Sequence, residues 1–100
     1  MVTRDGVIAV YITANRKNGT LYTGVTGDLP NRIEQHKSGA VRGFTSRYGV
    51  DRLVWCRVHD SMIEAIADEK RIKKYHRQWK INLVEAMNPD WLDLYLTLNR

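Results

Sequence analysis

Apolar and polar residues follow two different spacings along the chain, and the change of spacing separates strands from helices. Residues 7–12 and 20–26 are rich in β-branched and aromatic residues, which predicts two strands. The turn-rich segment between them contains Asn18 and Gly19, which tolerate positive φ, so the two strands predict a hairpin. Residues 52–58 have a similar apolar composition and predict a third strand.

Helix start and stop residues follow the hairpin. Asp28 is a candidate N-cap, Pro30 falls in the first turn, and Gly39 is placed to end a helix that runs to about Ser38. Residues 40–50 are then expected to form a loop.

Three further helices are predicted after the third strand. Ser61 is a candidate N-cap, and Glu64 three residues later fits a capping box, so a helix is expected to run to about His76. The last two helices are expected over residues 79–86 and 90–98, separated by Asn88-Pro89. The order β-β-α-β-α-α-α predicts one α+β domain over residues 1–100, with a small three-stranded, mostly antiparallel sheet flanked by helices.

The helix after Ser61 carries a carboxylate on its apolar face. Its apolar positions follow a 3-4-3 spacing that includes Glu69, whereas Asp68 is expected on the solvent side. The residues of this face are Met62, Ala65, Glu69 and Ile72, with Ile66 beside them. One interpretation is a Glu69 at the edge of the face that reaches solvent or an arginine. The other is a ligand for Mg²⁺, which takes one or two carboxylates and keeps several waters.

Two more elements place polar side chains beside apolar ones. Arg32 and His36 are four residues apart and share a helix face, either as solvated residues or as a phosphate clamp with a proton acceptor. Any even-length hairpin loop, such as a turn at Asn18-Gly19, places Tyr11 and Tyr22 on one face of the sheet. They are then either core aromatic residues or part of a site, with open space expected above Gly24.

Composition narrows the classes of partner. The chain has 100 residues with 16 basic and 11 acidic side chains, so the net charge is +5 and an anionic partner is favoured. Cys56 is the single cysteine, which excludes an internal disulfide, favours the reducing cytoplasm and is expected to be a buried, inert thiol. No apolar stretch reaches the length of about 18 residues that a membrane span needs.

Taken in order, these residues resemble the GIY-YIG nuclease superfamily, in particular a small stand-alone branch related to the nuclease domain of the excision-repair protein UvrC. The resemblance spans nearly the whole chain and rests on a Tyr-x-Gly-x-Thr…Arg…His series in the first half. The first motif is Ala9-Val10-Tyr11 instead of Gly-Ile-Tyr, and the second is Tyr22-Thr23-Gly24 instead of Tyr-Ile-Gly. The second half matches at Glu64-Ala65, Glu69-Lys70, Lys73-Lys74, Trp79-Lys80 and Asn88-Pro89.

The resemblance implies a metal-dependent endonuclease with six catalytic residues. Glu69 would hold one divalent ion, Mg²⁺ or Mn²⁺, and Tyr11 or His36 would act as the general base. A free phenol has a pKa of about 10, so Tyr11 needs help to act as a base at neutral pH. The remaining catalytic residues would be Tyr22, Arg32 and Asn82, with Asn88 as the alternative to Asn82.

A basic surface fits a nucleic-acid substrate, with DNA favoured over RNA. Phosphate contacts give affinity without sequence preference, so structure-selective or weakly sequence-selective cutting, as in repair or recombination, is expected. The residues assigned to nucleic-acid binding are Gly24, Lys37, Arg42, Arg47, Lys70, Lys73 and Lys74. The aromatic side chains among these charges either stack on bases or belong to the core, and the core is favoured for Trp79.

The competing hypotheses are a non-catalytic nucleic-acid-binding module with the same fold and a basic protein that binds another protein. A monomer or weak homodimer is expected, and a last helix carrying Asp90 and Asp93 is expected to lie away from the substrate.

Overall fold

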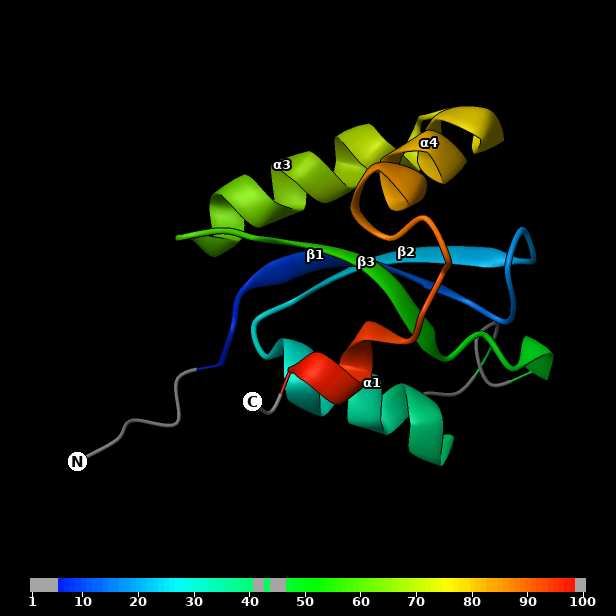
Figure 1. Cartoon of the computed structure of the whole chain (residues 1–100). Helices are drawn as coiled ribbons and strands as arrows, with labels where there is room; N and C mark the ends of the chain where they lie inside the picture. The colour runs from blue at the N-terminus through cyan, green and yellow to red at the C-terminus, as the bar shows by residue number, and fades with distance from the viewer. Residues whose placement is uncertain (1–5, 41–42, 44–46, 99–100) are drawn as a thin grey trace.

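The computed structural model describes residues 6–40, 43 and 47–98 of the chain. The elements, shown in Figure 1, are strands β1 (Ala9–Ala14) and β2 (Leu21–Thr26), helix α1 (Leu29–Ser38), strand β3 (Arg52–Val58), helices α3 (Met62–Lys73) and α4 (Arg77–Met87), and the 3₁₀ helix η1 (Leu94–Thr97). The strand order is β2-β1-β3, and both neighbouring pairs are antiparallel. The predicted α+β class and the three-stranded antiparallel sheet are confirmed.

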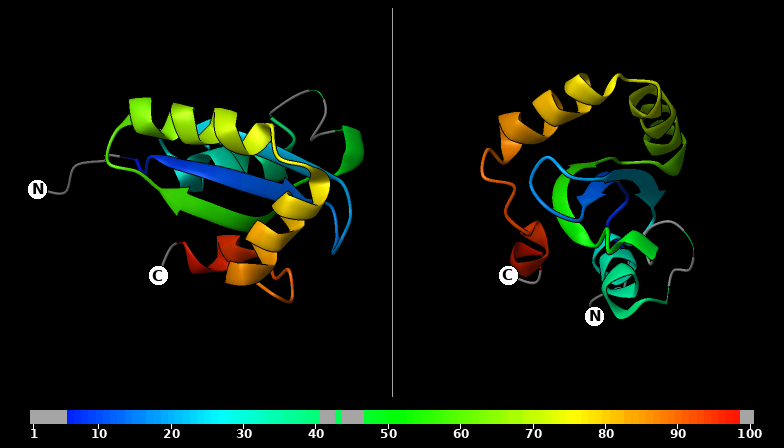
Figure 2. Two further views of the ribbon diagram at one scale, coloured as in Figure 1. Left: turned by 90° about the horizontal axis from the view of Figure 1, so that it is seen from above. Right: turned by 90° about the vertical axis from the view of Figure 1, so that its right-hand side faces the viewer.

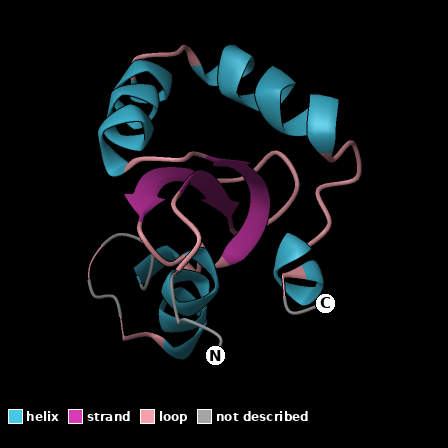
Figure 3. Ribbon diagram, turned by 90° about the vertical axis from the view of Figure 1, so that its left-hand side faces the viewer, coloured by secondary structure: helices cyan, strands magenta, loops and turns pink. Residues whose placement is uncertain are grey.

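The sheet is the middle of three layers. Helices α3 and α4 cover one face, and α1 with η1 covers the other (Figures 1, 2 and 3). The central strand β1 is buried along its whole length because both of its faces are covered. The core on the α3 side is built around Val10, Ile12 and Val54, and the core on the α1 side around Tyr11, Ile33 and Leu53.

The predicted boundaries are right where a cap residue marks them. Asp28 accepts a hydrogen bond from the Asn31 backbone N–H at the start of α1, and Gly39, with φ of 79°, ends that helix. Ser61 accepts a hydrogen bond from the Glu64 backbone N–H at the start of α3. Strand β3 has the predicted bounds.

Other boundaries differ because pairing or packing overrides local preference. The first strand begins at Ala9 instead of residue 7, because the Val7 and Ile8 carbonyls accept hydrogen bonds from Leu29 and His59 outside the sheet ladder. Helix α3 ends at Lys73, and α4 begins at Arg77, two residues earlier than predicted. The last predicted helix is reduced to η1, which begins only at Leu94.

Three predictions about burial are wrong. Asp68 is 1% exposed instead of facing solvent, because two guanidinium groups and an imidazole surround its carboxylate. Trp79 is 59% exposed instead of belonging to the core, because its ring packs edge-on against Tyr75 outside the buried clusters. Met62 and Ile66 are also more than one third exposed, so the buried face of α3 consists of Ala65, Asp68, Glu69 and Ile72.

Candidate active site at the β2 edge

Two tyrosines lie on the face of the sheet that α1 covers. Tyr11 pairs with Gly24 across the hairpin, and Tyr22 pairs with Thr13, so both phenol rings leave the same face. Their ring centroids are 6.3 Å apart. The hairpin loop has an even length, as the prediction requires, but it comprises residues 16–19, closed by hydrogen bonds between Asn15 and Thr20.

Gly24 makes room for the Tyr11 ring. A Cβ atom at position 24 would lie 2.5 Å from the Tyr11 hydroxyl oxygen, closer than any side chain tolerates. The prediction of open space above Gly24 is therefore wrong, because the phenol ring fills that space. This glycine positions the phenol, and it is buried.

His36 on α1 binds the Tyr11 phenol. The Tyr11 hydroxyl and His36 Nε2 are 3.0 Å apart, and His36 is 4% exposed. The imidazole lies edge-on to both phenol rings, with centroid distances of 5.7 Å to each. Arg32, one turn earlier on the same helix, is half-buried and close enough to affect the pKa values of both Tyr11 and His36.

The pKa shifts define the protonation states of the two groups in this hydrogen bond. Burial raises the pKa of Tyr11, neighbouring Tyr22 and Glu69 raise it further, and Arg32 only partly opposes them. Burial lowers the pKa of His36 below its usual 6.5, as does Arg32, against a smaller opposite effect of Asp51. At neutral pH the phenol is therefore protonated and the imidazole neutral, and in the tautomer with its proton on Nδ1 the imidazole accepts the phenol hydrogen at Nε2.

Glu69 lies on the other side of the sheet, within electrostatic range of Tyr11 in this cluster. Helix α3 covers the face opposite to α1 and contacts both β1 and the edge strand β2. The Glu69 carboxylate is 9% exposed, forms an ion pair of 2.7 Å with Lys73 Nζ, and is close enough to Tyr11 to raise the pKa of its phenol. Lys73 in turn lies within electrostatic range of Tyr22.

The donor set fits a metal site with a single carboxylate. Within residues 6–40, 43 and 47–98 there is no group of three or more His, Cys, Asp or Glu side chains able to hold an ion. Mg²⁺ is commonly held by one or two carboxylates together with water and substrate phosphates. A buried Glu69 whose one cationic partner here is the half-exposed Lys73 fits that pattern.

The structure does not bring Asn82 to the tyrosines. Asn82 is exposed on α4, which contacts β3 at the opposite edge of the sheet, and it accepts a hydrogen bond from Gln78. The alternative, Asn88, is buried, and its amide donates to the carbonyls of Val54 and Leu92. Asn88 therefore fixes the C-terminal segment to β3.

The predicted nucleic-acid contacts are spread over several elements. The Lys37 ammonium is held by Asp93 and the Asp51 carbonyl, so Asp93 lies beside one of the predicted phosphate ligands. Lys70, Lys74 and Arg47 are exposed. Arg42 lies outside the described residues. The Lys73–Glu69 pair follows i,i+4 spacing, a signal the sequence contains.

Cys56 is half-buried, and burial raises the pKa of its thiol, which keeps it protonated and unreactive at neutral pH. No helix within the described part of the chain is long and apolar enough to cross a membrane.

Comparison with known proteins defines the class. Residues 7–82 match the GIY-YIG catalytic domain, so the chain belongs to this nuclease family. Similar proteins include UPF0213 protein SSP2268 of Staphylococcus saprophyticus, 35% identical over 68 residues that cover 68% of this chain and 83% of the relative. UPF0213 protein SA0446 of Staphylococcus aureus is 34% identical over 68 residues, which again cover 68% of this chain and 83% of the relative.

The solved structure of another UPF0213 protein has a similar fold. The solution NMR structure of UPF0213 protein BH0048 from Bacillus halodurans is 33% identical, with a TM-score of 0.54, and the match covers 86% of this chain and 90% of that one. The chain is therefore similar to small UPF0213 proteins in fold and extent.

Proposed function

We propose that the protein is a metal-dependent endonuclease that hydrolyses DNA phosphodiester bonds at the β2 edge. The observation that carries the proposal is the gathering of Tyr11, Tyr22, Arg32, His36 and Glu69, from four elements, within contact or electrostatic range of one phenol. Membership in the GIY-YIG family supports a nuclease, and divalent metal use is general among its members. The basic net charge supports a nucleic-acid partner.

The hydrogen bond between Tyr11 and His36 supplies a route for the proton of the attacking water. A phenol with a raised pKa is a poor base alone, but it accepts a proton from water while its own proton passes to His36 Nε2. The resulting hydroxide attacks phosphorus, and the proton rests on an imidazole that was neutral beforehand. Base function therefore belongs to the Tyr11–His36 pair.

Arg32 and Glu69 are assigned to stabilising the negative charge of the phosphate. The Arg32 guanidinium stabilises the additional negative charge of the pentavalent phosphate. Glu69 is the residue that would hold a divalent ion, which supplies neutralisation of the phosphate and of the leaving oxygen. Tyr22, whose ring centroid lies 6.3 Å from that of Tyr11 and 5.7 Å from that of His36, orients water or phosphate.

The test is a nicking assay on single-stranded and branched DNA with Mg²⁺ or Mn²⁺. Glu69→Gln is expected to reduce cutting about 100-fold or more, because the variant loses the charge that holds the ion. Glu64→Gln removes the same charge from an exposed position of the same helix and is the matched control, with activity near wild type.

DNA binding is measured in parallel by fluorescence anisotropy. Binding by both variants with cutting lost only in Glu69→Gln supports the proposal. A wild-type protein that binds DNA but never cuts it with either metal would instead be a non-catalytic nucleic-acid-binding module, and the absence of salt-dependent DNA binding would exclude both functions.

A further inference from the structure

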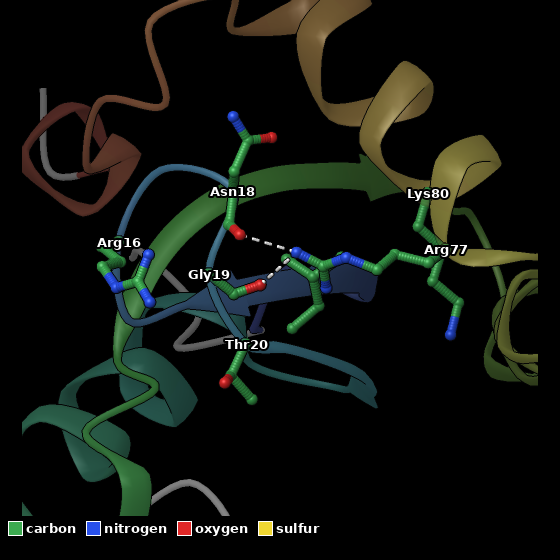
Figure 4. A pocket seen from close by; sticks show the side chains of 7 residues that line it. Arg16, Asn18, Gly19, Thr20, Arg77 and Lys80 are labelled. Carbon is green, nitrogen blue, oxygen red and sulfur yellow. Dashed lines mark hydrogen bonds between the residues drawn. The ribbon is translucent and has the colours of Figure 1, made fainter.

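A polar pocket lies where the β1–β2 loop meets the first turn of α4 (Figure 4). Its volume is about 420 Å³. The lining residues are Arg16, Asn18, Gly19, Thr20, Leu21, Arg77 and Lys80. None of these residues belongs to the candidate active site described above, and the lining contains three cationic side chains and no carboxylate.

Arg77 is fixed in this pocket without being neutralised. Its Nη2 donates to the backbone carbonyls of Asn18 and Gly19, both at 2.7 Å, as the dashed lines in Figure 4 show. Asn18 has a φ of 57°, which gives the loop its tight shape. Because carbonyl oxygens are uncharged, the guanidinium keeps its full positive charge in a defined position.

The other two cations also lack an acidic partner among the described residues. The ion pairs between described residues involve Lys37, Arg57, His59, Arg71 and Lys73, so Arg16 and Lys80 belong to none of them. Three uncompensated positive charges around one hollow attract an anion, and the Arg77 fork suits phosphate oxygens.

The pocket adjoins the candidate active site along β2. Leu21 lines the pocket, and Tyr22 is the next residue, with its side chain on the opposite face of the strand. Since β2 is an edge strand, a polynucleotide that crosses this edge passes the tyrosines on one side and the pocket on the other.

We propose that this pocket binds a backbone phosphate of the same nucleic-acid strand, away from the cleaved bond. The proposal rests on the proposed nuclease function and assigns it a second anchoring point. Phosphate in the pocket would fix the direction in which the strand crosses β2, and it would give affinity without sequence preference.

The test compares neighbouring cations in full-length protein. Affinity for fluorescein-labelled single-stranded and branched DNA is measured in EDTA, which prevents cutting, at several salt concentrations. Arg16→Ala and Lys80→Ala are each expected to reduce the slope of log affinity against log salt by about 1, as the loss of one phosphate contact requires. Lys17→Ala removes the same charge from the same loop outside the pocket and is the matched control.

The outcomes separate this inference from the nuclease proposal. A Lys17→Ala slope that falls as much as that of Arg16→Ala, or pocket variants with the wild-type slope, would overturn the phosphate site, while wild-type nicking would leave the nuclease proposal intact. Pocket variants with reduced slopes in a protein that never cuts would support the phosphate site and overturn the nuclease. Circular dichroism melting excludes misfolding as the cause of any lost binding.

Discussion

Asp68 and Glu69 are consecutive residues of α3, and both carboxylates are buried, but their surroundings differ. Asp68 accepts two hydrogen bonds from Arg57 Nη1, at 3.0 and 3.1 Å, lies 2.8 Å from His59 Nε2, and also pairs with Arg71. Glu69 has a single cationic partner in the described part of the chain, the half-exposed Lys73, and it lies within electrostatic range of the Tyr11 phenol.

The difference teaches how to separate a structural carboxylate from one available for chemistry. Burial alone does not distinguish the two, because both side chains are almost inaccessible. The carboxylate that two arginines and an imidazole surround has its charge balanced already and ties α3 to β3. The carboxylate with little compensation retains the capacity to hold another cation.

The largest expected effect is the difference in stability between the alanine variants of the two carboxylates. Asp68→Ala leaves Arg57, His59 and Arg71 without their common acceptor and is expected to cost about 2–3 kcal/mol, or roughly 10–20 °C in melting temperature. Glu69→Ala is expected to change the free energy of unfolding by less than about 1 kcal/mol, because it removes a costly buried charge with one mobile partner.

Urea unfolding measures both variants. Equal destabilisation by the two substitutions would contradict the distinction drawn between the carboxylates, and so would an Asp68→Ala protein as stable as wild type.

A smaller effect concerns pH. Because the pKa of His36 is lowered in the folded protein, the unfolded chain binds a proton below pH 6.5 before the folded chain does. Stability is therefore expected to fall as the pH drops from 6.5 through the lowered pKa of His36, and to be independent of this residue above 6.5. His36→Gln, measured by thermal melting between pH 5 and 8, should flatten this part of the profile.

The same pH range also tests the role of His36 in cutting. Cutting by the wild type should decline on the acid side as His36 becomes protonated and can no longer accept the Tyr11 proton. An activity profile without an acid limb would remove His36 from the proton route.

The smallest expected effect is on metal affinity. Lys73 occupies Glu69 Oε2, so Lys73→Ala is expected to lower the metal concentration for half-maximal nicking by about two- to fivefold, the range of a half-exposed ion pair. Lys74→Ala, which removes the adjacent charge from an exposed position, should leave that concentration unchanged. A higher metal requirement in Lys73→Ala would show that the ammonium assists the ion.

Residues with local signals were predictable from the sequence. Asp28, Gly39 and Ser61 mark helix ends through their own side chains or backbone, and the alternation of strands placed Tyr11 and Tyr22 on one face. The inward position of Glu69 followed from helical spacing.

Residues whose environment depends on distant segments were not predictable from the sequence. Asp68 is buried because Arg57 and His59, in and after β3, meet it there, and periodicity within α3 cannot show that. The pocket of Arg77 depends on carbonyls 58 and 59 residues earlier in the chain. Asn82 was assigned from motif spacing, which does not specify the edge of the sheet that α4 contacts.

The fit of the Tyr11 ring over Gly24 has a consequence for mutational surveys of this chain. In a saturation library, position 24 would score among the sensitive positions although hydrogen is its only substituent, because even a methyl group competes with the phenol oxygen for the same volume. A search that considers only residues with reactive groups would overlook it. The absence of a side chain at position 24 is thus as much a component of this arrangement as any side chain.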